Sequence, residues 1–293
     1  AQKTTITPAN ETQYWTPKYP GRYNVSLKAT NTAGSNTNTK ENALIVTNAD
    51  SKNGLTFSHT SAKVSVPVTE NLLGFVIEFW ANPSHLANYC WGMGDNEKNM
   101  LIRVDESGSM IITIKGTKFT SDKGFVQAGS WNHYAIRRAL NGAIYLYRNG
   151  VQFQYRAVAV NKNAIKDMST FTIGVDGMPM NGSIDEFRLW ASNYSGIANT
   201  CNQPLENPES YAAGDNKLRV YYDFNQSGGN VIDRSGNGND GVRSGFGPDG
   251  DAWGLSKGVF SLYLGEKQSD ETITAIEEVG AGEPVTAGRK GVY

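Results

Sequence analysis

The chain has 293 residues, of which 39% are hydrophobic and 19% are charged, and its formal net charge is -1. That hydrophobic content can form a core, so broad disorder is excluded, and the chain lacks a basic stripe that would neutralise phosphates, so nucleic acid is not an expected partner. No apolar run approaches the roughly 18 residues of a membrane-spanning helix, whereas 32 glycines and 11% aromatic residues favour short strands joined by tight turns.

The first predicted region, residues 1–49, has the pattern of strands. Apolar and polar residues alternate over 23–29, a turn follows at 31–35, and a further strand is predicted at 44–46. The stretch 20–35 resembles the last hairpin of a PKD domain, an immunoglobulin-like sandwich found as a spacer in secreted proteins. The resemblance implies an incomplete or degenerate PKD-like fragment, since it covers only the final strands.

A second region, residues 50–264, contains regularly spaced strands and no convincing long amphipathic helix. Asn149-Gly150 lies between two strand patterns and predicts a type I′ hairpin, because both central residues of that turn need positive φ. These features favour an antiparallel sandwich. Six residues on alternating positions are expected in its core: Phe75, Ile77, Phe79, Ile136, Phe187 and Leu189.

Five motifs in this region occur in the order seen in LamG-like jelly rolls. They are Val76–Pro83, Trp131–Ile136, Tyr145–Gly150, Phe171–Gly174 and Gly182–Trp190. Residues 54–195 therefore resemble the laminin G type 3 class of concanavalin A-like domains. The resemblance implies an all-β, two-sheet antiparallel jelly-roll sandwich in an extracellular protein that binds glycans, matrix or other proteins.

Two later segments carry weaker resemblances. Residues 218–264 resemble the beginning of a LamG domain, so we interpret them as a partial repeat that either supplies missing edge strands or starts an appended lobe. Residues 265–293 are polar, and the stretch 274–279 resembles the linker before a C-terminal sorting domain of exported bacterial surface proteins. That resemblance implies a secreted or cell-surface location.

No catalytic residue is predicted. Jelly-roll glycoside hydrolases need two carboxylates on one sheet face, which requires acidic residues at alternate strand positions. Glu78 stands alone on its strand, and Asp185 and Glu186 are neighbours that should point apart. Asp185 is expected to share the core-facing row of Phe187 and Leu189, and so to need a backbone or arginine partner.

A calcium site is the sharpest cofactor hypothesis, and no other cofactor is expected. Asp233, Ser235, Asn237 and Asp240 place oxygen atoms at the spacing of the first half of a calcium loop, although the acidic residue that would close such a loop is absent. The alternative is an Asx-turn loop in which Asn and Gly serve the backbone alone. The two cysteines, likewise, could form one disulfide or remain two buried thiols.

Glycan binding requires an exposed aromatic ring near amide or carboxylate groups. Tyr155, Tyr194 and Trp253 are the candidate ligand-binding residues, because they lie in predicted loops or strand ends. The sequence thus favours a non-catalytic carbohydrate-binding or adhesion module of an exported bacterial surface protein. The alternatives are a structural spacer or protein-interaction domain without a small ligand, and a diverged glycoside hydrolase.

Overall fold

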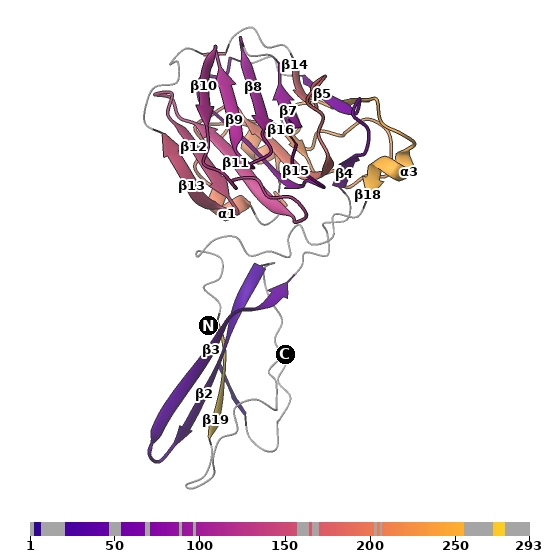
Figure 1. Cartoon of the computed structure of the whole chain (residues 1–293). Coiled ribbons are helices and arrows are strands. Elements are labelled where there is room, and N and C mark those ends of the chain that lie inside the picture. The colour runs from indigo at the N-terminus through magenta and orange to yellow at the C-terminus, as the bar shows by residue number, and fades with distance from the viewer. Residues whose placement is uncertain are drawn as a thin grey trace. The chain divides into compact units, whose positions relative to one another are not determined.

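The structure is a computed structural model, and the chain divides into two compact units. One unit comprises residues 1–48 and 260–293, and the other comprises residues 49–259 (Figure 1). The structure describes residues 3–6, 21–46, 54–67, 71–87, 90–95, 98–156, 164–165, 170–201, 204–205, 207–254 and 272–278.

The smaller unit contains a four-stranded sheet with the order β1-β19-β2-β3. Its strands are β1 (Lys3–Ile6), β2 (Gly21–Asn31), β3 (Gly34–Val46) and β19 (Thr272–Glu278). β2 and β3 form the antiparallel hairpin that the alternation predicts, and β19 pairs in parallel with both β1 and β2. A strand from the segment expected to be a linker therefore joins this sheet. The PKD-like and sorting-linker resemblances stay predictions.

The larger unit is a sandwich of two antiparallel sheets, which confirms the predicted fold class. The seven-stranded sheet consists, in order, of β10 (Thr117–Thr120), β9 (Met110–Ile114), β8 (Met100–Val104), β7 (Cys90–Gly94), β14 (Thr170–Ile173), β5 (Lys63–Pro67) and β17 (Val242–Ser244). The eight-stranded sheet consists of β13 (Val151–Arg156), β12 (Ile144–Arg148), β11 (Asn132–Arg138), β6 (Phe75–Asn82), β15 (Gly182–Trp190), β4 (Gly54–Phe57) and β18 (Trp253–Gly254), with β16 (Leu218–Tyr222) also paired to β15.

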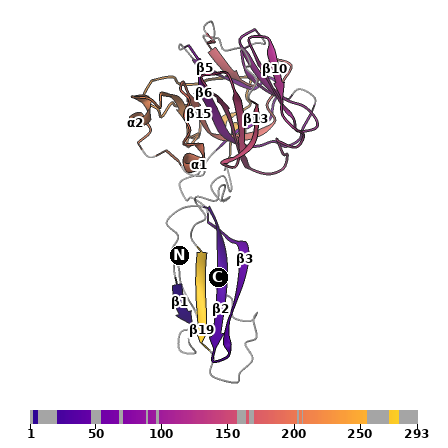
Figure 2. The ribbon, with the colours of Figure 1, turned by 90° about the vertical axis from the view of Figure 1, so that its left-hand side faces the viewer.

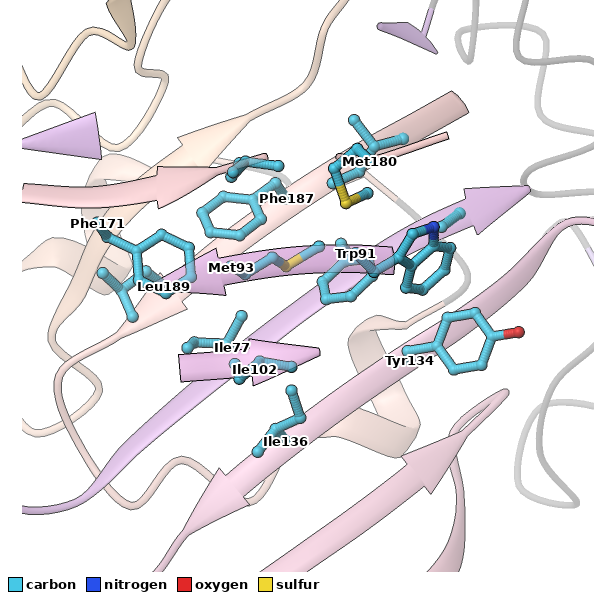
Figure 3. Close-up of a cluster of buried hydrophobic side chains, with 14 of the residues drawn as sticks. Ile77, Trp91, Met93, Ile102, Tyr134, Ile136, Phe171, Met180, Phe187 and Leu189 are labelled. Carbon is cyan, nitrogen blue, oxygen red and sulfur yellow. The ribbon is translucent and has the colours of Figure 1, made fainter. Parts of the chain in front are cut away.

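The core lies between the two sheets, where apolar side chains from both point toward one another (Figure 3). Phe187 of β15 contacts the rings of Phe79 and Phe171, with ring centroids 6.4 and 5.9 Å apart. All six predicted core residues are fully buried, so the alternation identified the inner face correctly. The Asn149-Gly150 hairpin is also present, with φ values of 55° and 74°.

The predicted partial repeat completes both sheets. β16 pairs with β15 and β18 pairs with β4 in one sheet, while β17 pairs with β5 in the other. Val220 and Tyr222 of β16 are fully buried in the core cluster. Of the two interpretations left open by the sequence, the supply of edge strands agrees with this pairing.

A bulge in β15 corrects the expectation for Asp185. The register shifts between Asp185 and Arg188, and Glu186 has a φ of 52°. Asp185 consequently lies opposite Trp80, on the outer face of the eight-stranded sheet, whereas Phe187 points to the core. Its Oδ1 accepts a hydrogen bond from the backbone N–H of Glu186 at 2.8 Å. The assignment of Asp185 from strict alternation was wrong, because the extra residue of the bulge reverses which side chains point to the core on either side of it.

Three helices of four residues each occur in the described part of the larger unit: α1 (Ile197–Thr200), α2 (Glu209–Ala212) and α3 (Asp249–Ala252). The described residues of the segment 191–217 include α1 and α2, which lie beside β15 (Figure 2), and α2 contacts β16. Ile197 and Leu205 of this segment join Val76 and Trp190 of the outer face in a second apolar cluster. We call this segment the cap. No helix in the described residues is long and apolar enough to cross a membrane.

Both cysteines are free and buried, Cys90 in β7 and Cys201 directly after α1. The structure thus corresponds to the second of the two alternatives that the sequence left open. Burial raises the pKa of each thiol, most strongly that of Cys201, because a thiolate would lose its hydration there.

Candidate functional site

A polar pocket of about 690 Å³ lies at one end of the sandwich. Its lining comes from three connections: the entry to β6, the turn between β11 and β12, and the two ends of the cap. Leu73, Leu140 and Tyr194 supply apolar surface, and the two leucines are 39% and 58% exposed. The polar lining residues are Asn71, Ser192, Asn193, Ser195, Asp215, Asn216 and Lys217. Ligand pockets of this volume typically combine apolar walls with a few polar groups in this way.

The wall of the pocket is held by hydrogen bonds to backbone carbonyls. The fully buried Arg138 donates from Nη1 to the carbonyls of Leu72 and Leu73. Ser192 Oγ donates to the carbonyl of Asn216 at 2.5 Å, and the N–H of Ala191 donates to Lys217 at 2.9 Å. These bonds fix the backbone, so the lining side chains are presented from a rigid frame.

Three side-chain amides of the pocket are free to bind a ligand. Asn71, Asn193 and Asn216 are exposed, and within the described parts of the chain their side chains make no hydrogen bond. Each amide offers two donors and one acceptor. Sugar hydroxyls both donate and accept, so such groups match them without requiring a charge.

Tyr194 lines the pocket from the cap. Its ring stacks on Trp190 with centroids 3.9 Å apart and planes 7° apart, and its hydroxyl lies 3.5 Å from Thr200 Oγ1. Burial raises the pKa of Tyr194 to about 12. The stack leaves Tyr194 half-buried, so it is a fixed wall of the pocket and not a freely exposed ring.

The other two predicted aromatic residues lie elsewhere. Tyr155 is 47% exposed on β13, whereas Trp253 is 8% exposed on β18 and contacts Phe224 with a centroid distance of 6.3 Å. β13 and β18 are opposite edges of one sheet. The structure therefore does not bring Tyr155 and Trp253 into one site, and Trp253 belongs to the core cluster.

A second hollow of about 450 Å³ lies beside β17. Its charged residue, Arg243, donates to Asp249 at 2.6 Å and covers the rings of Phe246 and Trp253. Since that guanidinium is already engaged, this hollow is a weaker candidate than the polar pocket.

A network of buried charges lies on the outer face of the sheet beneath the cap. Arg188 Nη2 is 2.7 Å from Glu186 Oε2, which also accepts a 2.7 Å bond from the hydroxyl of Tyr221. Arg188 Nη1 donates to the carbonyl of Thr200 at 2.8 Å, and so ties the sheet to the cap.

Glu78 belongs to the same network. Its Oε1 accepts a 2.9 Å bond from Trp190 Nε1, and its Oε2 lies 3.2 Å from His133 Nε2. Burial pushes the pKa of Glu78 upward, but its contact with His133 and the charge of Arg188 outweigh burial and hold that pKa below its ordinary value. Burial dominates for Glu186 and raises its pKa to about 7, and burial lowers the pKa of His133.

These carboxylates are inaccessible to a substrate. Glu78, Asp185 and Glu186 each expose at most 1% of their surface. A hydrolytic pair must flank a bound sugar, and the cap occupies the space over this part of the sheet. The network therefore fastens the cap to the sheet.

The predicted calcium loop is organised around Asp233. The carboxylate of Asp233 accepts four hydrogen bonds, from the N–H groups of Tyr221, Ser235 and Asn239 and from the hydroxyl of Ser235, at 2.8 to 3.0 Å. Asp240 Oδ1 accepts from the N–H of Asp233 at 2.8 Å.

Asn237 donates from Nδ2 to Leu218 and Ser235, so the four predicted residues do lie in one loop. Their arrangement is that of an Asx-type loop bound to β16. In the described part of the chain, no group of three His, Cys, Asp or Glu side chains is placed to hold a metal ion. The calcium hypothesis stays a prediction.

Residues 57–196 match the family model described as the concanavalin A-like lectin/glucanases superfamily. This match covers the region in which the five LamG-like motifs occur. No curated protein matches the chain.

Three solved structures are similar to parts of this chain at low sequence identity. A protein from Bacteroides ovatus, named as a proposed carbohydrate-binding protein, superimposes with a TM-score of 0.53 and 19% identity, over 73% of this chain and 63% of that one. A heptameric SAP-like pentraxin from Limulus polyphemus has a TM-score of 0.41 and 12% sequence identity, over 53% of this chain and 85% of the pentraxin chain. Domain 4 of an extracellular arabinanase from Geobacillus stearothermophilus, in complex with arabinotriose, has a TM-score of 0.34 and 18% sequence identity, over 55% of this chain and 73% of that domain's chain. Because its sequence identity is only 19%, the Bacteroides match shows that the fold is shared and nothing more.

Proposed function

We propose that the larger unit is a non-catalytic carbohydrate-binding module, and that the polar pocket is its ligand site. The pocket carries the proposal, because it combines three unengaged amides with the apolar surface of Leu73, Leu140 and Tyr194. A sugar presents apolar C–H faces and a ring of hydroxyls, and therefore matches both kinds of lining. The name of the Bacteroides ovatus protein with the same fold supports the same class of ligand.

The absence of catalysis is part of this proposal. The carboxylates of β6 and β15 are used in the buried network, and the described lining of the pocket contains a single carboxylate, Asp215, whereas hydrolysis requires a pair. We further propose that the chain is exported and acts at a cell surface, which its PKD-like stretch and sorting-linker-like segment support. A calcium ion in the 233–240 loop would serve stability and not ligand recognition, since that loop does not line the pocket.

A glycan array with the full chain tests the proposal. We expect retention of glycans by the wild type, and at least about tenfold weaker binding by an Asn193→Ala/Asn216→Ala double variant, because each lost hydrogen bond contributes about 1 kcal/mol. The matched control is Asn36→Ala/Asn38→Ala, which removes two exposed asparagines of β3 in the smaller unit and should bind normally. No reducing sugar should be released from any bound polysaccharide.

Two results would overturn the proposal. Sugar release that survives purification to homogeneity would identify an enzyme. A wild-type chain that retains no glycan, yet binds a purified extracellular protein, would favour the interaction-domain alternative, for which the exposed Leu73 and Leu140 are the natural contacts.

A further inference from the structure

A row of side chains crosses the outer face of the eight-stranded sheet outside the polar pocket. Arg137 of β11 lies opposite Tyr145 of β12, and Tyr145 lies opposite Tyr155 of β13. Residues directly opposite one another in adjacent antiparallel strands share a face. In the other direction, Arg137 lies opposite Val76, which lies opposite Trp190. The row therefore runs from the ring beneath Tyr194 to the exposed edge strand, over about 19 Å at about 4.8 Å per strand.

The outer end of this row carries an aromatic platform, the stacked rings of Tyr145 and Tyr155. The rings of Tyr145 and Tyr155 stack with centroids 4.6 Å apart and an interplanar angle of 29°. Tyr155 is 47% exposed and Tyr145 is half-buried. An exposed ring whose orientation is fixed by stacking can receive the apolar face of a pyranose ring at little cost in side-chain entropy.

Arg137 gives the platform a positive charge. Its guanidinium carbon lies 4.8 Å from the centroid of the Tyr145 ring. Among the described residues Arg137 makes no ion pair, and its buried Nε has no hydrogen-bond partner. A guanidinium in this state can still bind a carboxylate with two parallel hydrogen bonds.

The stretch of sequence that contains the platform has basic residues and no acidic ones. Residues 123–166 contain no Asp or Glu, although the whole chain has a net charge of -1. The basic residues of this stretch are Lys123, Arg137, Arg138, Arg148, Arg156, Lys162 and Lys166. No carboxylate of the stretch itself can therefore compete for Arg137.

From these observations we propose that the face formed by Arg137, Tyr145 and Tyr155 binds an acidic polysaccharide of uronate residues. Tyr155 receives one sugar ring, and Arg137 pairs with the carboxylate of a neighbouring sugar residue, because the ring of Tyr145 lies between Arg137 and Tyr155. The inference rests on the proposed function, that the larger unit binds carbohydrate, and adds a contact face outside the pocket. Val76 and Trp190, at the inner end of the row, are fully buried beneath the cap, so the exposed part of the row is formed by Arg137, Tyr145 and Tyr155. A polymer can place successive sugar residues on this face, whereas a single terminal sugar cannot reach both Tyr155 and Arg137.

Polygalacturonate and its fully methyl-esterified form are suitable test ligands, because they share one sugar ring and differ in charge. Calorimetry with the full chain should give tighter binding of the acidic polymer, weakened by added salt because exposed charges are screened. Arg137→Gln should weaken this binding by roughly tenfold or more and remove the preference over the ester, since hydrogen bonds to charged groups contribute about 1.5–3 kcal/mol. Tyr155→Ala should weaken the binding of both polymers by about tenfold, whereas the Tyr155→Phe variant should bind them like the wild type.

Arg234→Gln is the charge-matched control, since Arg234 pairs with Asp223 outside the platform, and it should leave binding unchanged. Equal binding of both polymers by the wild type would overturn the inference. So would acidic binding that Asn193→Ala/Asn216→Ala abolishes and Arg137→Gln does not, although the proposed function would then stand. Retention of no glycan of any kind would overturn both.

Discussion

Arg188 and Glu186 form an ion pair on the outer face of β15, with Nη2 2.7 Å from Oε2 and neither side chain more than 1% exposed. The two residues are two positions apart, so strand alternation places them on one side, and the bulge at Glu186 turns Asp185 to that side as well. Arg188 also faces Glu78 at 3.6 Å and donates to the cap at Thr200. One guanidinium therefore connects two strands and the segment that covers them.

Removal of this guanidinium should cost much of the stability of the larger unit. We expect Arg188→Met to lower the free energy of unfolding by about 3–5 kcal/mol, because two carboxylates would remain buried without their cation. Urea denaturation measures the change. Arg234→Met is the matched control: its pair with Asp223 is 40% exposed on the arginine side, so a loss below about 1 kcal/mol is expected. Similar losses in both variants would show that the buried pair has no special role.

The pH dependence of the free energy of unfolding should reveal the raised pKa of Glu186. Its pKa of about 7 in the folded chain exceeds the ordinary value of 4.5, so the folded chain binds the extra proton between those values. The contribution of Glu186 to stability therefore falls as pH rises through this window. The pKa of His133 is lowered from 6.5, so its contribution rises with pH below that value and partly offsets Glu186.

Glu186→Gln separates the two effects. The variant lacks the contribution of Glu186, which falls as pH rises. Its free energy of unfolding should therefore rise with pH more steeply than that of the wild type, by up to about 1.4 kcal/mol per pH unit between about pH 5 and pH 7. Denaturant titrations at several pH values give the two curves. Parallel curves would mean that Glu186 titrates near its ordinary value in the folded chain.

The loop at Asp233 should depend on its carboxylate more than on calcium. Asp233→Ala leaves the N–H groups of Tyr221, Ser235 and Asn239 without their acceptor, and we expect a loss of about 2 kcal/mol or more. Because those donors already occupy both oxygens, the melting temperature of the wild type should be equal in millimolar calcium and in chelator. A rise with calcium that Asp240→Asn abolishes would instead support the calcium site, since an ion bound to the folded state alone stabilises it.

The two thiols should react very slowly with thiol reagents in the folded chain. Cys90 and Cys201 are buried and free, and burial raises the pKa of both, so little reactive thiolate forms at neutral pH. A thiol reagent should react slowly under native conditions and should label two thiols per chain in denaturant without reductant. Fewer than two would indicate a disulfide.

The sequence by itself determined the sandwich and its inner face. Phe187 and Leu189 could be assigned to the core because strand side chains alternate, and Asn149-Gly150 fixed a hairpin because few other residue pairs tolerate its backbone. These are local properties, decided within a few residues, and the structure confirmed them.

The site was decided by contacts between distant segments. Tyr194 could be named from sequence as a candidate, but its place in one pocket with Leu140 and Asn216 depends on the cap folding back over β15. Arg137 was missed as a binding residue, although the absence of Asp and Glu over 123–166 was a visible signal. Asp185 was assigned to the wrong face because a bulge adds one residue to a strand, and alternation alone does not reveal where. Strand pairing and the path of the cap bring together residues that are far apart in the chain, so only the tertiary structure decides which of them share a surface.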